Sequence, residues 1–263
     1  MRRSRFIAPL VGLAAVVTAT LSLSAPASAA SGDNYVALGD SYSSGVGTGS
    51  ESGDCLRSDA AYPGLWASAN APASYTSVAC SGATTTDVNN SQLSALSSST
   101  TLVSITIGGN DVGFSDIMTT CALQGEDACI GAVSQAESSA QANLPGWLDT
   151  TYNGISSNAP NARVVVLDYP VFYQLGTICV GLSDASHAKI DEGIDMIDGI
   201  IASAASRHGF RFGDVRSAFV GHQLCSGDKW LHALNFGDIT ESYHPNASGH
   251  SGGYYPVFSS AAG

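Results

Sequence analysis

The sequence has few basic residues. Ten Lys and Arg stand against 22 Asp and Glu among 263 residues, which gives a formal net charge of −12 at pH 7. Proteins bind phosphate backbones with clustered Lys and Arg, so this balance argues against a nucleic-acid partner. The same acidity predicts repulsion from anionic bilayers, and its simplest consequence is solubility.

Metal-binding motifs are also scarce. No Cys-x-x-Cys occurs and the six His residues are scattered, so a zinc site has little support. The six cysteines, an even number, instead indicate up to three disulfides in an exported protein. They allow fifteen pairings, and sequence alone does not choose among them. We expect pairing in chain order, namely Cys55–Cys80, Cys121–Cys129 and Cys179–Cys225.

Residues 1–30 have the pattern of a secretory signal peptide. Arg2, Arg3 and Arg5 precede an apolar run over residues 6–23, and residues 27–29 form a small-x-small cleavage site. A membrane anchor is the alternative, but no basic cluster follows and the chain turns polar at Ser31. We expect a secreted, extracellular protein whose residues 31–263 form a single domain. Without residues 1–30, seven basic and 22 acidic residues leave a net charge of −15.

Short apolar runs alternate with helical patterns along this domain. Residues 35–38, 102–107 and 163–167 predict buried strands, each ended by Gly or by Asp-Tyr-Pro, and residues 211–215 are a weaker fourth. Residues 186–207 predict an amphipathic helix, and residues 93–102 and 134–156 are looser helical candidates. This alternation predicts an α/β fold, a three-layer α/β/α sandwich around a mainly parallel sheet. Ligands of such sheets bind beyond the carboxyl ends of the strands.

Four polar or glycine-containing segments carry the candidate chemistry. Ser41 follows the first strand on a glycine-lined turn, where it is either an exposed nucleophile or a helix N-cap. Asn110 follows the strand over residues 102–107. It is either an oxyanion-hole residue whose side-chain amide donates a hydrogen bond, or simply part of a Gly-Asn-Asp turn. Gly82 offers a backbone N–H at a further turn. His244, held before Pro245, is the candidate general base.

Residues 249–253 also match G-x-S-x-G, the nucleophile motif of another hydrolase fold. That motif requires a preceding strand and a later acid and histidine, yet only ten residues follow Gly253. Ser251 is therefore expected in a loop without a catalytic role.

The four segments together, in this order, resemble the SGNH hydrolases, also called GDSL lipases and esterases. Residues 39–41, Gly82, residues 108–111 and His244 match the family's four blocks, and the secreted actinobacterial lipases and phospholipases look closest. The resemblance implies that Ser41 is the nucleophile and His244 its base. It also implies an oxyanion hole made by the Ser41 and Gly82 N–H groups and the Asn110 side chain, with no metal or organic cofactor.

Two positions depart from the family pattern. Tyr42 stands where the family has Leu, and Glu241 stands where the family usually has the Asp that orients the histidine. The carbonyl of Ser242 is the alternative orienting group, so the site is either a Ser-His-Glu triad or a Ser-His dyad.

The sequence thus predicts a carboxylic ester hydrolase acting on lipid esters, as a lipase or esterase or as a phospholipase A. A carbohydrate acetylesterase is the second candidate, and a non-catalytic binding protein of the same fold is the third. A lipid or other ester is the expected substrate. The protein is expected to be a monomer that touches lipid interfaces transiently.

Overall fold

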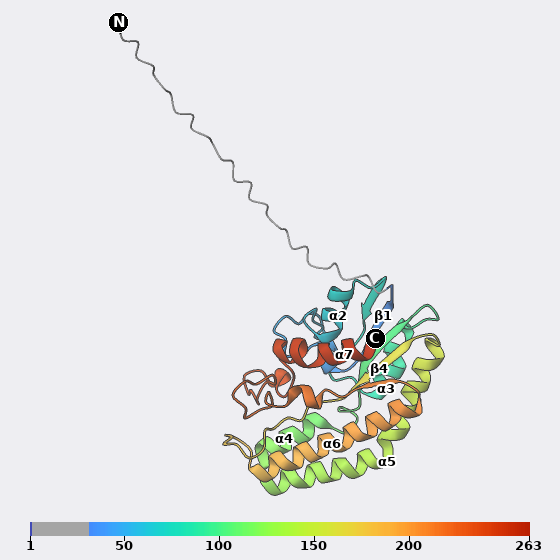
Figure 1. The fold of residues 1–263 in the computed structure, drawn as a ribbon. Coiled ribbons are helices and arrows are strands. Elements are labelled where there is room, and N and C mark those ends of the chain that lie inside the picture. Colours follow the sequence, from blue (N-terminus) through green and yellow to red (C-terminus); the bar gives the residue numbers. More distant parts are fainter. Residues whose placement is uncertain (2–31) are drawn as a thin grey trace.

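Five parallel strands form one sheet in the order β2-β1-β3-β4-β5. Figure 1 shows β1 and β4 of this sheet with helices packed around it. The computed structural model describes Met1 and residues 32–263, so the expected signal peptide lies outside the described residues, Met1 apart. The strands are β1 Asn34–Gly39, β2 Ser74–Ser77, β3 Leu102–Thr106, β4 Arg163–Leu167 and β5 Arg211–Gly213. The predicted parallel sheet is confirmed.

Helices cover both faces of this sheet. Helices α2 and α7 pack together on one face, where α7 contacts β4 and β5; on the other, α6 lies against β4 and β5 and packs on α5. The helices are α1 Ser41–Ser44, α2 Tyr62–Asn70, α3 Thr85–Asp87, α4 Phe114–Gln124, α5 Glu126–Asn158, α6 Asp184–Arg207 and α7 Tyr255–Ala262. Single turns span Val88–Gln92, Leu93–Ala95, Arg216–Phe219, Ile239–Glu241 and Gly249–Tyr254. The three-layer sandwich is therefore confirmed.

The three more strongly predicted strands are those that the sheet buries on both faces. The weaker prediction over 211–215 forms the shorter edge strand β5, whose first two residues are not buried. Almost every residue of β1, β3 and β4 is buried, which is why each is a nearly continuous apolar run. Strand β2 was not predicted, because this edge strand is a partly exposed Ser-Tyr-Thr-Ser sequence without an apolar face.

The helical predictions have mixed outcomes. Helix α6 begins two residues before the predicted 186–207, because Ser183 caps it by accepting a hydrogen bond from Ser186 N at 3.2 Å. Helix α5 is longer than the predicted 134–156 at both ends. The helix expected over 93–102 is wrong: only Leu93–Ala95 forms a turn. Beyond it, the Thr100 hydroxyl accepts from Ser97 N at 3.1 Å, a local bond that competes with helical pairing.

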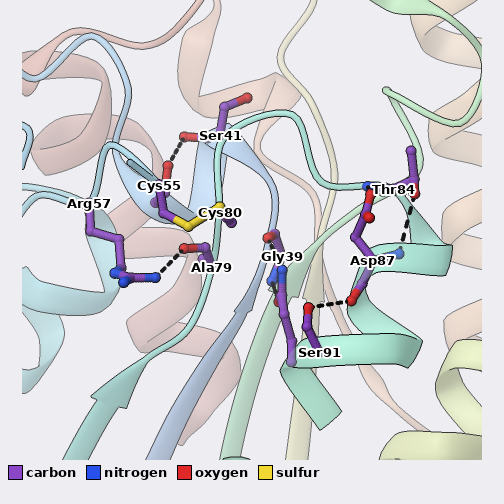
Figure 2. The surroundings of a disulfide bond; sticks show 11 residues. Gly39, Ser41, Cys55, Arg57, Ala79, Cys80, Thr84, Asp87 and Ser91 are labelled. Atoms are coloured by element: carbon purple, nitrogen blue, oxygen red, sulfur yellow. Dashed lines mark hydrogen bonds between the residues drawn. A yellow bond between two sulfur atoms is a disulfide. The ribbon is translucent and has the colours of Figure 1, made fainter. Parts of the chain in front are cut away.

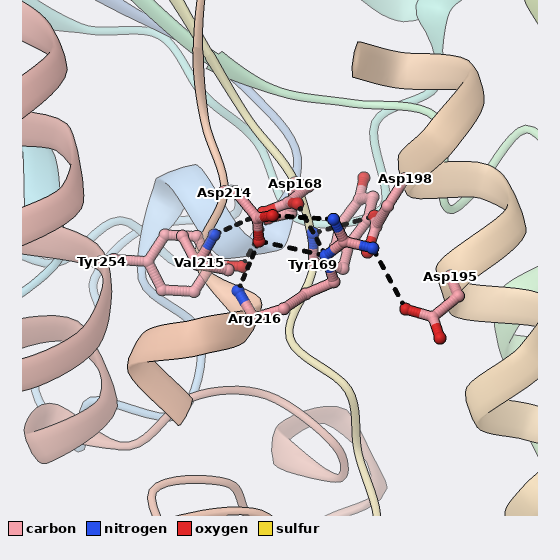
Figure 3. Close-up of polar contacts among 8 residues, drawn as sticks. All are labelled: Asp168, Tyr169, Asp195, Asp198, Asp214, Val215, Arg216 and Tyr254. Atoms are coloured by element: carbon pink, nitrogen blue, oxygen red, sulfur yellow. Dashed lines mark hydrogen bonds and ion pairs between the residues drawn. The ribbon is translucent and has the colours of Figure 1, made fainter. Parts of the chain in front are cut away.

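A buried acidic cluster holds the carboxyl end of β4 (Figure 3). Asp168 Oδ1 accepts from Val215 N at 2.8 Å, and Asp198 Oδ1 accepts from Tyr169 N at 3.1 Å. Arg216 Nε lies 3.5 Å from Asp168 Oδ2. Burial raises the pKa of Asp168 to about 8 and raises the pKa of Asp198 well above its ordinary value. The cluster fixes the backbone at Tyr169, whose side chain reaches the candidate site.

Replacing Asp168 by Asn is expected to flatten the dependence of stability on pH. Because the folded-state pKa of Asp168 is raised, its contribution to stability is fully present below about pH 4 and is lost as the pH rises toward about 8. Asn keeps an acceptor for Val215 N but does not titrate. Between about pH 5 and pH 9, denaturant unfolding should show the wild type losing on the order of 1–3 kcal/mol more than Asp168→Asn.

Asp195→Asn is the matched control, since Asp195 also pairs with Arg216 but is exposed. It should keep the wild-type profile. Parallel profiles for the wild type and Asp168→Asn would show that Asp168 is not the titrating group.

Candidate active site

Ser41 lies one residue beyond Asp40, which follows the end of β1 at Gly39. Gly39 there has φ +123°, and a Cβ would lie 2.4 Å from the Thr106 carbonyl oxygen, so only glycine fits. Asp40 then caps α1 by accepting a hydrogen bond from Tyr42 N at 3.0 Å. The turn leaves Ser41 7% exposed, with its side chain in the wall of a pocket.

His244 meets Ser41 from the far end of the chain. Its Nε2 lies 2.7 Å from Ser41 Oγ, across a separation of 203 residues. Two backbone bonds hold the histidine segment, since His232 N donates to His244 O at 2.9 Å and Tyr243 N donates to His232 O at 2.8 Å. His244 lines the pocket and is partly buried. Desolvation of its ring lowers the pKa to about 4, and the Ser242 backbone opposes this shift.

The Glu241 carboxylate faces away from this pair. Its Oε1 accepts from Asn235 Nδ2 at 2.9 Å, and its Oε2 lies 3.8 Å from His232 Nδ1. His244 Nδ1 is buried and has no partner within hydrogen-bonding geometry among the described residues. The backbone groups of Ser242, Thr240 and Glu241 each raise the pKa of His244 and so oppose part of its desolvation.

Gly82 lies in the turn that follows β2, and it lines the same pocket as Ser41. The Cys55–Cys80 disulfide precedes this turn, and Cys80 N donates to Gly39 O at 3.0 Å, so the turn is attached to the end of β1 (Figure 2). The structure also contains the disulfides Cys121–Cys129 and Cys179–Cys225.

Asn110 lies beyond β3 in the wall of this pocket. Its Nδ2 donates to Ala83 O at 3.0 Å, which uses one of its two amide N–H groups and leaves the other for a ligand. The next residue, Asp111, accepts from Thr85 N at 3.0 Å and from Thr85 Oγ1 at 2.5 Å. These bonds join the Asn110 turn to the segment after Gly82. Ser41, Gly82, Asn110 and His244 are thus brought together.

Several residues that hold the site were not predicted. Tyr169 Oη donates to Asp40 Oδ2 at 2.5 Å and accepts from Gly109 N at 3.1 Å, so it links the ends of β1, β3 and β4. Gln92 is bonded to both backbone groups of Gly39, at 2.7 and 2.9 Å. Burial raises the pKa of Asp40 to about 6, against the lowering effect of its bonds to Tyr169 and Thr106.

Tyr42, the departure from the family pattern, also has a positioning contact. Its Oη donates to Tyr243 O at 2.8 Å, and its ring centroid lies 5.1 Å from that of His244. Tyr243 has a positive φ of 67°, an uncommon conformation for a non-glycine residue. The Tyr42 hydroxyl therefore holds the residue before the histidine in this conformation.

The pocket has a volume of about 520 Å³ and is mostly apolar away from Ser41. Its apolar lining includes Phe114, Met118, Leu123, Phe172, Ile194 and Ile197. Met118 and Phe172 are almost wholly buried, so they pack in the core while forming this wall. A pocket of this volume can hold an extended apolar group next to Ser41.

Ser251 is exposed and does not line this pocket. The expectation that it lies in a loop is wrong, because Gly249–Tyr254 forms a helical turn. The Ser251 hydroxyl donates to the carbonyl of Ser248, the residue before that turn, at 3.4 Å.

Two further features concern metals and membranes. Among the described residues, no three His, Cys, Asp or Glu side chains are grouped so that they could hold a metal ion. In the same part of the chain, no helix has both the length and the apolar character needed to cross a bilayer.

A serine in contact with a histidine, at the carboxyl edge of a parallel sheet and beside an apolar pocket, is the arrangement typical of serine ester hydrolases. The chain belongs to the GDSL-like Lipase/Acylhydrolase family, whose model matches residues 37–251. It is therefore an ester-hydrolysing enzyme, and the predicted family is confirmed.

Relatives from Streptomyces are similar over most of their length. Lipase 1 of Streptomyces coelicolor is 53% identical, and the match covers 100% of both chains. The crystal structure of phospholipase A1 from Streptomyces albidoflavus NA297 is 52% identical with a TM-score of 0.87, covering 88% of this chain and 100% of that one. The extracellular lipase of Streptomyces rimosus is 53% identical with a TM-score of 0.85, covering 86% and 98%.

Removing the Tyr42 hydroxyl is expected to slow ester hydrolysis. In Tyr42→Phe the Tyr243 carbonyl loses its partner inside the protein, at a cost of about 1–3 kcal/mol, and His244 is less firmly held. We expect kcat to fall about tenfold while KM changes little, measured on a soluble p-nitrophenyl ester.

Tyr173→Phe is the matched control, because the Tyr173 hydroxyl contacts the Tyr243 side chain, at 3.4 Å, rather than its backbone. It should retain most of the wild-type kcat. Equal kcat losses in the two variants would refute the specific role of the Tyr42 bond.

Proposed function

We propose that this protein is a secreted hydrolase of lipid esters, a lipase or esterase or a phospholipase A, and that it works by a Ser-His mechanism. The observation that carries the proposal is the 2.7 Å contact between Ser41 Oγ and His244 Nε2 beside an apolar pocket of about 520 Å³. The relatives named lipase and phospholipase A1, each more than half identical, support lipids as the substrate class.

The Ser41 hydroxyl attacks the ester carbonyl carbon while His244 Nε2 takes its proton. The C–O bond to the alcohol then breaks, and the imidazolium returns the proton to the leaving alkoxide. Water then attacks the acyl carbon while His244 Nε2 takes its proton. The C–O bond to Ser41 breaks, the imidazolium returns the proton to Ser41 Oγ, and the fatty acid is released. No step requires a metal or an organic cofactor.

The tetrahedral oxyanion receives hydrogen bonds from Ser41 N, Gly82 N and the free N–H of Asn110. In support, all three residues line the pocket, and their turns are tied together by the bonds at Cys80, Ala83 and Asp111. Losing one such donor costs about 10²–10³ in rate.

We assign the orientation of His244 to the Ser242 carbonyl, which makes the site a dyad. The Glu241 carboxylate is engaged by Asn235 and lies near His232, which argues against a triad. The imidazolium is then stabilised by backbone dipoles rather than by a carboxylate.

We also infer that the protein is exported and acts as a single-domain monomer that contacts lipid interfaces transiently. The signal-peptide pattern in residues 1–30, the three disulfides and the extracellular relative from S. rimosus support export. The strongly acidic composition argues against a nucleic-acid partner.

The acid limb of the pH–rate profile is expected at about pH 4. His244 must be neutral to accept the Ser41 proton, and desolvation lowers its pKa to about 4. Initial rates on a soluble p-nitrophenyl ester should give a kcat/KM that is level above this pH and falls about tenfold per unit below it.

Glu241→Gln is the control for the dyad and should keep the wild-type midpoint and rate. A wild-type midpoint near 6.5, the value of an exposed histidine, would contradict the desolvated base. A lower midpoint in Glu241→Gln would restore Glu241 as the orienting group.

Ser41→Ala is expected to abolish turnover of every ester that the wild type hydrolyses, by at least about 10⁴-fold. The panel contains p-nitrophenyl acetate to palmitate, a triacylglycerol, a phosphatidylcholine and acetylated xylan. Ser251→Ala, which removes the exposed serine of the G-x-S-x-G pattern, should retain full activity.

The preferred substrate decides among the candidates. Turnover of long-chain and phosphatidylcholine esters supports the lipid-ester proposal, whereas a preference for acetylated xylan makes the protein a carbohydrate acetylesterase. Turnover that survives in Ser41→Ala would reject the nucleophile, and inactivity on all esters would favour a binding protein.

A further inference from the structure

The wall of the catalytic pocket continues onto the surface as three exposed apolar side chains. Leu123, Phe236 and Ile239 line the pocket, yet they are 67%, 75% and 58% exposed. We name these three residues the apolar lip. Single exposed apolar residues are ordinary on soluble proteins, but three large ones around one opening are the pattern of an interaction surface.

Both sides of the lip are braced. Leu123 lies near the end of α4, between the two cysteines of the Cys121–Cys129 disulfide that joins α4 to α5. On the other side, Asn235 accepts from Gly237 N at 2.9 Å and donates to Glu241 at 2.9 Å, which closes a compact loop around Phe236 and Ile239. These bonds hold the loops so that the lip residues stay outside the core.

The charges around the lip select the kind of surface that it fits. Residues 114–127 and 232–244, which carry the lip, contain no Lys or Arg. They contain five acidic residues, namely Asp116, Glu126, Asp127, Asp238 and Glu241. These acidic residues repel an anionic lipid surface. The outward choline group of phosphatidylcholine is cationic and complements their charge.

The geometry points to a docking role for the apolar lip: Leu123, Phe236 and Ile239 seat the protein on a zwitterionic phosphatidylcholine surface. An acyl chain then passes from the lipid into the pocket along a continuous apolar path. The inference rests on the proposed function, since it concerns the entrance of the same site. Beyond the proposed function, the inference identifies the residues that contact the lipid and the zwitterionic headgroup that they prefer.

Vesicle binding tests this surface separately from catalysis when it is measured in the Ser41→Ala background, where lipid is not consumed. Flotation with phosphatidylcholine vesicles should recover the Ser41→Ala parent. The additional changes Leu123→Ser, Phe236→Ser and Ile239→Ser should together lower the partition coefficient at least about tenfold. Val220→Ser is the matched control, because Val220 is 70% exposed but does not line the pocket, and it should bind like the parent.

A second reporter does not depend on the folding of the triple variant. Phe236→Trp in the same background should show a blue shift of tryptophan emission when phosphatidylcholine vesicles are added, and Val220→Trp should add none beyond the parent's own signal. Adding phosphatidylglycerol to the vesicles should weaken binding.

Three results would overturn the inference. They are equal binding by the parent and the triple variant, no spectral shift specific to Phe236→Trp, and binding that requires anionic lipid. None of them depends on whether Ser41 is the nucleophile, so a failure of the docking surface is distinguishable from a failure of the proposed function.

Discussion

The carboxylate of Asp40 joins the ends of three strands. One of its oxygens accepts from Tyr42 N and Thr106 Oγ1, and the other accepts from Tyr169 Oη, which itself accepts from Gly109 N. The same residue caps α1 and so orients Ser41. A single buried acid therefore helps to fix the relative position of the Ser41 and Asn110 turns. These bonds offset part of its desolvation, since burial still raises its pKa to about 6.

The histidine arrives by a different route, because no strand of the sheet carries it. Its loop is attached by backbone bonds to the His232 segment and by the Tyr42 hydroxyl to the nucleophile's own helix. Tyr42, the residue after Ser41, thus holds Tyr243, the residue before His244. A smaller apolar side chain at position 42 would leave the Tyr243 carbonyl without this donor, so the departure from the usual family sequence is matched by a compensating contact.

The sequence could predict the features that are encoded by neighbouring residues, but not the contacts between residues far apart in the chain. Strands β1, β3 and β4 are apolar because both of their faces are buried, and Ser41, Gly82, Asn110 and His244 stand in ordered motifs. Strand β2 carries no such signal, because an edge strand of Ser, Tyr and Thr resembles a loop. The bonds of Gln92, Tyr169 and Tyr42 join residues 53 to 201 positions apart, so no local pattern could identify them.

The burial that forms the pocket also sets the chemistry of the base. Desolvation lowers the pKa of His244, so the ring stays neutral and ready to accept a proton over a wide pH range. The same shift weakens the ring as a base, because the imidazolium formed in the transition state is itself desolvated. In the dyad that we propose, no carboxylate offsets this cost. Hydrogen bonds to the oxyanion must then lower more of the activation barrier. The bonds that fix the Gly82 and Asn110 turns are therefore important for catalysis.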